Sequence, residues 1–182
     1  MSAGPPRLAH AQVPLLGIAA FSGTGKTTLL TRLIPLLKDA GLRVGLIKHS
    51  HHALEIDYPG KDSYELRQAG ASPVMLSSSH RRAIMTEHPA PHEPDLDGEL
   101  RYFDQTGVDL ILVEGFKQEH FPKIELHRPS LGRPLLFPSD DSVIAVANDG
   151  TIRVETPIPQ LDLNAPEQIA RFILDEFLPH AS

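Results

Sequence analysis

The stretch AAFSGTGKTTLL, from Ala19 to Leu30, has the residue types and the spacing of a loop that binds nucleotide phosphates. Such loops follow the pattern G-x-x-x-x-G-K-[ST] between a strand and a helix. Gly25, Lys26 and Thr27 match the end of this pattern, but Ala20 occupies the place of its first glycine. Since that place ends the strand, a methyl group is tolerated there at a negative φ angle. We therefore expect the loop to hold phosphate.

The residues of this loop divide into backbone and side-chain roles. Gly23 and Gly25 permit conformations that turn N–H groups inward around an anion, at the positive end of the following helix. Lys26 is expected to bridge the β- and γ-phosphates, the hydroxyl of Thr27 to bind Mg²⁺, and Thr28 to reach the α-phosphate. The predicted nucleotide-binding residues of the loop are Ser22, Gly23, Thr24, Gly25, Lys26, Thr27 and Thr28. A glycine turn without a ligand is the alternative, but it gives no reason for the lysine and the paired threonines.

A second acidic group for the metal is expected in DLILVEGF, which reads as a buried strand that ends at Glu114. Ligands of open α/β sheets gather at the carboxyl ends of the strands. Glu114 is therefore predicted to hold a Mg²⁺-bound water or to orient an attacking water, which makes it a catalytic candidate together with Lys26. A carboxylate that simply faces solvent is the alternative interpretation.

The segment IKHSHHALEID, from Ile47 to Asp57, follows another predicted strand and is rich in histidine. Its imidazoles at His49, His51 and His52 suggest a transition-metal site. However, successive residues after a strand point in opposite directions, and no ligand spacing emerges. A polar switch loop near the γ-phosphate is the preferred interpretation, with Asp57 or Asp62 as a magnesium partner.

The base of the nucleotide is expected to contact IAVAND, where Asp149 follows a late apolar strand. A carboxylate in that place accepts both N1–H and the 2-amino group of guanine, whereas adenine offers no matching pair of donors. Asn148 is a candidate to assist. An ordinary Asn-Asp-Gly turn explains the same residues nearly as well.

Composition limits the other functions. The chain has 182 residues, 41% hydrophobic and 22% charged, and no cysteine, which excludes disulfides, thiolate metal sites and thiol catalysis. Its net charge of −6 argues against a nucleic-acid or anionic-membrane partner. Apolar runs are far shorter than the roughly 20 residues that cross a bilayer. We expect a cytoplasmic protein that binds neither nucleic acid nor membrane.

Strand-like and helix-like segments alternate along the chain, which predicts an α/β fold with a mostly parallel sheet of the phosphate-loop type, flanked by helices, and a small additional β segment. Residues 1–12 are expected to form a flexible tail and residues 13–182 a single nucleotide-binding domain. Within it, residues 88–97 read as a loose proline-rich loop and about 116–142 as a β/loop extension. PVMLSSS and RRAIMTE are two further strand candidates, and Asn164 with Glu167 suggests a capping box before the last helix.

The chain resembles the molybdopterin-guanine dinucleotide biosynthesis protein B family (MobB). The resemblance rests on FSGTGKTTLL, GLIKHSHH, PGKDSYELRQAGA, MTE, DLILVEGFK, KIELHR and VIAVAND, which span roughly residues 13–150 in order. Alanine at position 20 is also typical of that family. The resemblance therefore covers the whole predicted core and not the phosphate loop alone.

This resemblance implies a homodimeric GTP-binding adaptor with weak GTPase activity and Mg²⁺ as cofactor. It implies work beside the guanylyltransferase that attaches GMP to molybdopterin, with molybdopterin or molybdoenzymes as further partners, and an added β segment in the dimer contact. No arginine is evident that would speed hydrolysis in cis; Arg67, Arg81 and Arg82 are the ones to follow. A small-molecule kinase or ATP-dependent ligase, and a binding module without hydrolysis, remain as alternative functions.

Overall fold

The computed structural model describes residues 8–50, 56–150 and 156–181. The chain divides into two compact units, one formed by Met1–His49 with Asp95–Ser182 and the other by Ser50–Pro94. The larger unit contains the phosphate loop.

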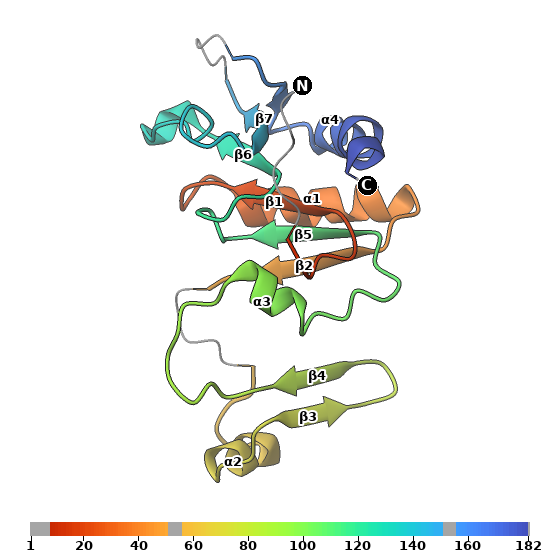
Figure 1. The fold of residues 1–182 in the computed structure, drawn as a ribbon, viewed down its shortest axis with the longest axis vertical. Coiled ribbons are helices and arrows are strands. Elements are labelled where there is room, and N and C mark those ends of the chain that lie inside the picture. Colours follow the sequence, from red (N-terminus) through yellow and green to blue (C-terminus); the bar gives the residue numbers. More distant parts are fainter. Residues whose placement is uncertain (1–7, 51–55, 151–155, 182) are drawn as a thin grey trace. The chain divides into compact units, whose positions relative to one another are not determined.

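The larger unit is built on a sheet of six strands in the order β2-β5-β1-β6-β7-β8 (Figure 1). Every neighbouring pair is parallel, so all six strands end at the same edge. The strands are β1 (Leu15–Ala19), β2 (Val44–Lys48), β5 (Leu110–Glu114), β6 (Lys123–His127), β7 (Val143–Asn148) and β8 (Gln160–Asp162). This arrangement confirms the predicted parallel α/β fold.

Helices cover both faces of the sheet because successive strand residues point to opposite sides. On one face, Leu33 of α1 (Lys26–Asp39) and Ile169 of α4 (Pro166–Arg171) share a buried core with Leu112 of β5. On the other face, Leu96 of α3 (Leu96–Leu100) packs in a second core with Ile111. The remaining elements of this unit are the π-helix η2 (Phe172–Phe177) and the 3-10 helices η1 (Pro129–Leu131) and η3 (Leu178–His180).

The last helix begins differently from the prediction. Its N-cap is Ala165, without a side-chain hydrogen bond, so the capping box expected at Asn164 is wrong. Proline at the first helical position needs no N–H partner, which lets the helix start without a cap. The carboxamide oxygen of Gln168 instead accepts a hydrogen bond from the N–H of Asp162 at 2.7 Å and ties the helix to β8.

The smaller unit contains α2 (Asp62–Gln68) and the antiparallel pair β3 (Val74–Ser77) and β4 (Arg82–Met85). Both strand candidates are therefore confirmed, and they form the small additional β segment.

Residues 116–142, expected as an extension, supply β6, which lies between β1 and β7 in the main sheet. The sequence did not predict this buried strand because Lys123 and Glu125, each 1% exposed, interrupt its apolar run. The carboxylate of Glu125 accepts hydrogen bonds from the N–H groups of Leu136 at 2.8 Å and Phe137 at 3.0 Å, which ties the following loop to the sheet.

Candidate functional site

The carboxyl edge of the parallel sheet brings the predicted site residues of the larger unit together. In the strand pairing, Ile18 of β1 lies opposite Glu114 of β5, and Glu114 lies opposite Lys48 of β2. Residues that follow these strands therefore gather at one place, as is general for ligand sites of open α/β sheets. The segments that meet there are 20–26, 48–49, 114–117, 128 and 149.

The loop after β1 has the backbone of an anion-binding nest. Gly23 and Gly25 have φ angles of +82° and +101°, a region that favours glycine. The hydroxyl of Thr24 donates a hydrogen bond to the carbonyl of Phe21 at 2.8 Å and so shapes the loop from inside. The helix α1 starts directly at Lys26, which adds the positive end of its dipole.

Ala20 lies away from the phosphate-binding part of the loop. Its side chain is fully buried and belongs to the core between the sheet and α1. Ala20 is not one of the described residues with a positive φ angle, so its backbone tolerates a methyl group. The departure from the general pattern thus contributes packing and does not obstruct the loop.

Several cations surround this loop. The ammonium of Lys26 lies 3.3 Å from the carbonyl oxygens of both Ala20 and Phe21. Lys117 and Arg133 lie over the ring of Phe21, at 5.1 Å and 5.6 Å from its centroid. Partial desolvation, followed by the charge of Lys26, lowers the pKa of Lys117, although much of its side chain is exposed. These groups form a positive collar in a chain of net charge −6.

Glu114 lies in a tightly built junction between β5 and β2. Its carboxylate forms an ion pair with Lys48 at 3.2 Å, and its carbonyl accepts a hydrogen bond from the N–H of His49 at 2.8 Å. A Cβ on Gly115 would lie 2.7 Å from that of His49, so only glycine fits. Phe116 has a φ angle of +51°, and its ring stacks on His49 with centroids 4.9 Å apart. The junction fixes the direction of the Glu114 carboxylate.

Arg128, which sequence reasoning missed, connects the phosphate loop to Asp149. Its Nε donates a hydrogen bond to the carbonyl of Thr24 at 2.8 Å, and its Nη1 forms an ion pair with Asp149. Arg128 directly follows β6, which pairs with β1 on one side and β7 on the other. Only knowledge of this strand order would have identified it from the sequence.

Asp57 and Asp62 belong to the smaller unit and have local partners there. Asp57 is 3% exposed, and its carboxylate forms an ion pair with Arg67 at 2.7 Å. Arg67 also forms an ion pair with Glu87 at 2.7 Å. Asp62 accepts a hydrogen bond from the N–H of Ser63 at 2.9 Å. The role of Asp57 toward magnesium stays a prediction.

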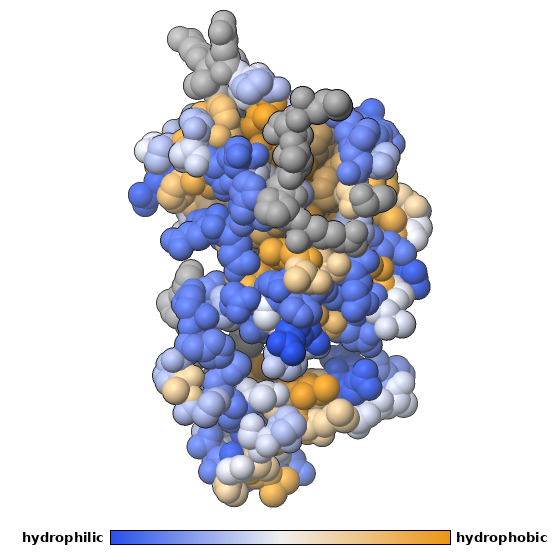
Figure 2. Space-filling model, viewed as in Figure 1, coloured by the Kyte–Doolittle hydropathy of each residue, from blue (hydrophilic) through white to orange (hydrophobic). Residues whose placement is uncertain are grey.

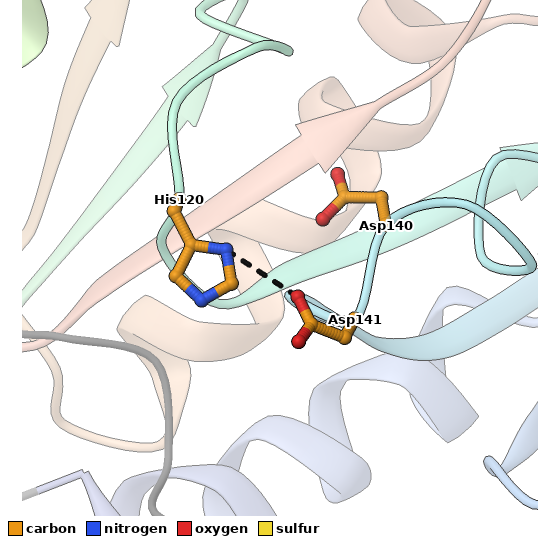
Figure 3. A group of neighbouring side chains, drawn as sticks. All are labelled: His120, Asp140 and Asp141. Carbon is orange, nitrogen blue, oxygen red and sulfur yellow. Dashed lines mark ion pairs between the residues drawn. The ribbon is translucent and has the colours of Figure 1, made fainter.

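The predicted histidine cluster is described only in part. His49 stacks on Phe116, whereas His51 and His52 lie outside the described residues. In the described part of the chain, the side chains that approach closely enough to share a metal ion are His120, Asp140 and Asp141 (Figure 3). They precede β6 and β7 and so lie at the amino edge of the sheet, opposite the phosphate loop. Asp140 already binds Lys123 at 3.1 Å, which disfavours a further cation.

The comparisons with known proteins agree with this architecture. The family model described as molybdopterin guanine dinucleotide synthesis protein B matches residues 15–149. The chain belongs to this family. Its match begins at β1 and ends at Asp149, so it covers every segment gathered at the carboxyl edge of the main sheet.

Relatives of the MobB family align over nearly the full chain. The molybdopterin-guanine dinucleotide biosynthesis adapter protein of Escherichia coli K12 is 49% identical over 164 residues, which cover 90% of this chain and 93% of that protein. The adapter protein of Haemophilus influenzae is 49% identical over 170 residues, covering 93% and 92%. A crystal structure of molybdopterin-guanine biosynthesis protein B has a TM-score of 0.67 at 26% identity, over 88% of this chain and 97% of that one. Within the described residues, no helix has the length and apolar character needed to cross a membrane.

Proposed function

We propose that this MobB chain binds GTP with Mg²⁺ at the phosphate loop and acts as an adapter in the synthesis of molybdopterin guanine dinucleotide. The two relatives at 49% identity carry the name of adapter proteins in this biosynthesis. The enzyme that such an adapter assists is the guanylyltransferase that joins GMP to molybdopterin, with molybdopterin or a molybdoenzyme as further partners.

The observation that carries the nucleotide proposal is the positive collar around a preformed nest. Lys26 approaches two carbonyl oxygens at 3.3 Å, which is long for a hydrogen bond from an ammonium group. Desolvation, and after it repulsion from Lys26, lowers the pKa of Lys117. A triphosphate would bring negative charge to these groups, and Gly23 and Gly25 present the backbone that it needs.

Thr27 and Glu114 fit a magnesium ion by their chemistry, because Mg²⁺ prefers oxygen ligands and keeps several waters. Thr27 is exposed in the first turn of α1, and Glu114 is held in position by the β5–β2 junction. When bound, the ion neutralises phosphate charge. The Glu114 carboxylate then orients a water toward the γ-phosphate, once its ion pair with Lys48 has opened.

Hydrolysis at this site is proposed to be slow. Among the described residues, Arg128 and Arg133 lie next to the loop; Nε and Nη1 of Arg128 are already bound by Thr24 and Asp149, and Arg133 lies over the ring of Phe21. A guanidinium that is held in this way stabilises less transition-state charge than an arginine directed at the γ-phosphate. The nucleotide would therefore serve mainly as a bound ligand.

The smaller unit supports the proposal of a homodimer. Met75 and Ile84 lie opposite each other in the β3–β4 pair and are 57% and 54% exposed. Figure 2 shows hydrophobic residues at the surface of this unit among hydrophilic ones. A two-stranded sheet is only marginally stable by itself, so addition of the same sheet from a second copy would stabilise it. Sedimentation of the wild type and of Ile84→Asp tests this, and a monomeric wild type would refute it.

The test of the nucleotide proposal is an equilibrium titration of the chain with Mg²⁺–GTP and Mg²⁺–ATP. We expect GTP to bind more tightly, and Lys26→Ala to weaken GTP binding about 100-fold or more. Lys38→Ala, an exposed lysine on the same helix, is the matched control and should bind as the wild type does.

Three results would contradict the proposal. They are a preference for ATP with phosphate transfer to a small acceptor, unchanged binding by Lys26→Ala, and unassisted GTP turnover at the ~1–100 s⁻¹ typical of kinases.

A further inference from the structure

Arg128 makes two contacts that lie on different parts of the carboxyl edge. Its Nε donates to the carbonyl oxygen of Thr24 in the phosphate loop at 2.8 Å. Its Nη1 forms an ion pair with Oδ2 of Asp149, which follows β7. The side chains of Arg128 and Asp149 are 30% and 20% exposed, so this pair is better shielded than an ion pair on an open surface.

The first contact orients a peptide group of the anion-binding nest. In a planar trans peptide, the carbonyl and the following N–H point in opposite directions. Because Arg128 holds the carbonyl of Thr24, the N–H of Gly25 points away from the guanidinium. A Cβ on Gly25 would lie 3.6 Å from Nη2 of Arg128, which shows how closely the two groups approach. The guanidinium thus fixes one of the donors that a nest turns toward its anion.

The second contact orients the carboxylate that is proposed to bind guanine. A carboxylate has two oxygens with about four acceptor positions, and Arg128 uses one oxygen of Asp149. The carboxylate can therefore keep this contact while it accepts hydrogen bonds from a base. The planar guanidinium fixes both of its contacts in one rigid group, whereas a lysine ammonium on a flexible stem has no such geometry.

We infer that Arg128 is a positioning residue that couples the phosphate loop to guanine recognition. It holds the Thr24–Gly25 peptide for the phosphates and the Asp149 carboxylate for N1–H and the 2-amino group of the base. This inference rests on the proposed function, since it requires GTP at the loop. If Arg128 only contacted phosphate, its substitution would weaken the binding of all nucleoside triphosphates equally. If it only stabilised the fold, its substitution would change the melting temperature but not the base preference.

The experiment compares Arg128→Lys with the wild type in titrations with Mg²⁺–GTP and Mg²⁺–ITP, because inosine lacks the 2-amino group. We expect the wild type to prefer GTP by about tenfold or more, as one charge-assisted hydrogen bond allows. Arg128→Lys should weaken the binding of both nucleotides and lower the ratio of GTP affinity to ITP affinity to about 3 or less. Arg32→Lys, on the exposed side of α1, is the matched control and should change neither value.

Two further variants separate the outcomes. Asp149→Asn should lower the same ratio, and Arg128→Lys combined with Asp149→Asn should lower it no further, because the two residues act as one unit. An unchanged ratio in Arg128→Lys, with normal GTP binding by the wild type and its loss in Lys26→Ala, refutes the inference alone. Absence of GTP binding by the folded wild type refutes the proposed function and the inference with it.

Discussion

Charged side chains at the two edges of the central sheet differ in how closely the chain itself binds them. At the amino edge, the side chain of Lys123 is 2% exposed, and its ammonium is bound by the carbonyl of Glu119, by Asp140 at 3.1 Å and by the hydroxyl of Ser142 at 2.6 Å. At the carboxyl edge, Lys26 has two carbonyl oxygens at 3.3 Å. Lys123 is neutralised within the chain, whereas Lys26 makes only these two long contacts among the described residues and is the lysine for which we propose a phosphate partner.

The same difference extends beyond the two lysines. At the amino edge, Arg43 and Asp109 pair before β2 and β5 at 2.8 Å. The carboxyl edge also has ion pairs, but there each carboxylate, Glu114 and Asp149, is one for which we propose a ligand. The charges named at the amino edge are therefore paired with each other, whereas the ion pairs named at the carboxyl edge include the carboxylates for which we propose a ligand.

The largest effect is expected when the same substitution is made in both lysines. Lys123→Met leaves the buried Ser142 and the partly exposed carboxylate of Asp140 without their cation, so the free energy of unfolding should fall by about 1–3 kcal/mol. Lys26→Met removes only long contacts to carbonyls and should change it by less than about 0.5 kcal/mol. Urea unfolding followed by circular dichroism measures both values.

A second substitution in the first variant tests the reason for this loss. Asp140→Asn added to Lys123→Met removes the uncompensated charge and should recover part of the stability. Equal losses in Lys123→Met and Lys26→Met would show that the two edges do not differ in the way described.

A smaller effect, of opposite sign for stability and for binding, is expected at Lys117. Its pKa is lowered from 10.5 in the folded chain, so the charged form is disfavoured there and costs stability at neutral pH. That cost disappears as the pH rises through the lowered pKa toward 10.5. Lys117→Gln should therefore melt slightly above the wild type at pH 7, and this difference should shrink at higher pH.

The binding half of this prediction follows from the same charge. Lys117→Gln removes one cation from the positive collar and should weaken Mg²⁺–GTP about fivefold, the scale of a partly exposed ion pair. Titration at pH 7 beside the wild type measures it. A variant that lost stability without losing affinity would place Lys117 among the structural charges.

The sequence allowed the parts of the site that depend on neighbouring residues to be predicted. The loop around Gly23 and Gly25 and the position of Glu114 at a strand end both follow from short local patterns. Arg128 could not be found in this way because its partners are 104 and 21 positions away and meet it only through the strand order. The arrangement of parallel strands depends on long-range packing that local patterns do not encode.

The charged strand β6 was obscured for a different physical reason. A buried strand of a parallel sheet normally reads as an apolar run, and Lys123 and Glu125 interrupt this one. Burial raises the pKa of Glu125, although the N–H groups of Leu136 and Phe137 bind the carboxylate and oppose that shift. Their partners come from the turn before β6, at Glu119, and from the loop between β6 and β7, so they became visible only in the structure.

The smallest effect is expected at Arg43 and Asp109, which test the amino edge at its exposed side. The side-chain hydrogen bonds from Arg43, followed by its backbone N–H, lower the pKa of Asp109 to about 2. A carboxyl group whose pKa is depressed on folding stabilises the fold above its unfolded value of 3.8, and this contribution is lost as the pH falls toward about 2. Asp109→Asn should therefore lower the melting temperature slightly at pH 7 and hardly at all near pH 2.

The double variant Asp109→Asn with Arg43→Met provides the control for this pair. If the two side chains stabilise the fold through each other, the double variant should lose little more than Asp109→Asn alone. Melting curves at pH 7 and pH 2 for the wild type, Asp109→Asn, Arg43→Met and the double variant supply the cycle. Additive losses would mean that Arg43 and Asp109 do not stabilise the fold through their ion pair. The stabilising ion pair of the amino edge would then be that of Lys123 with its partners.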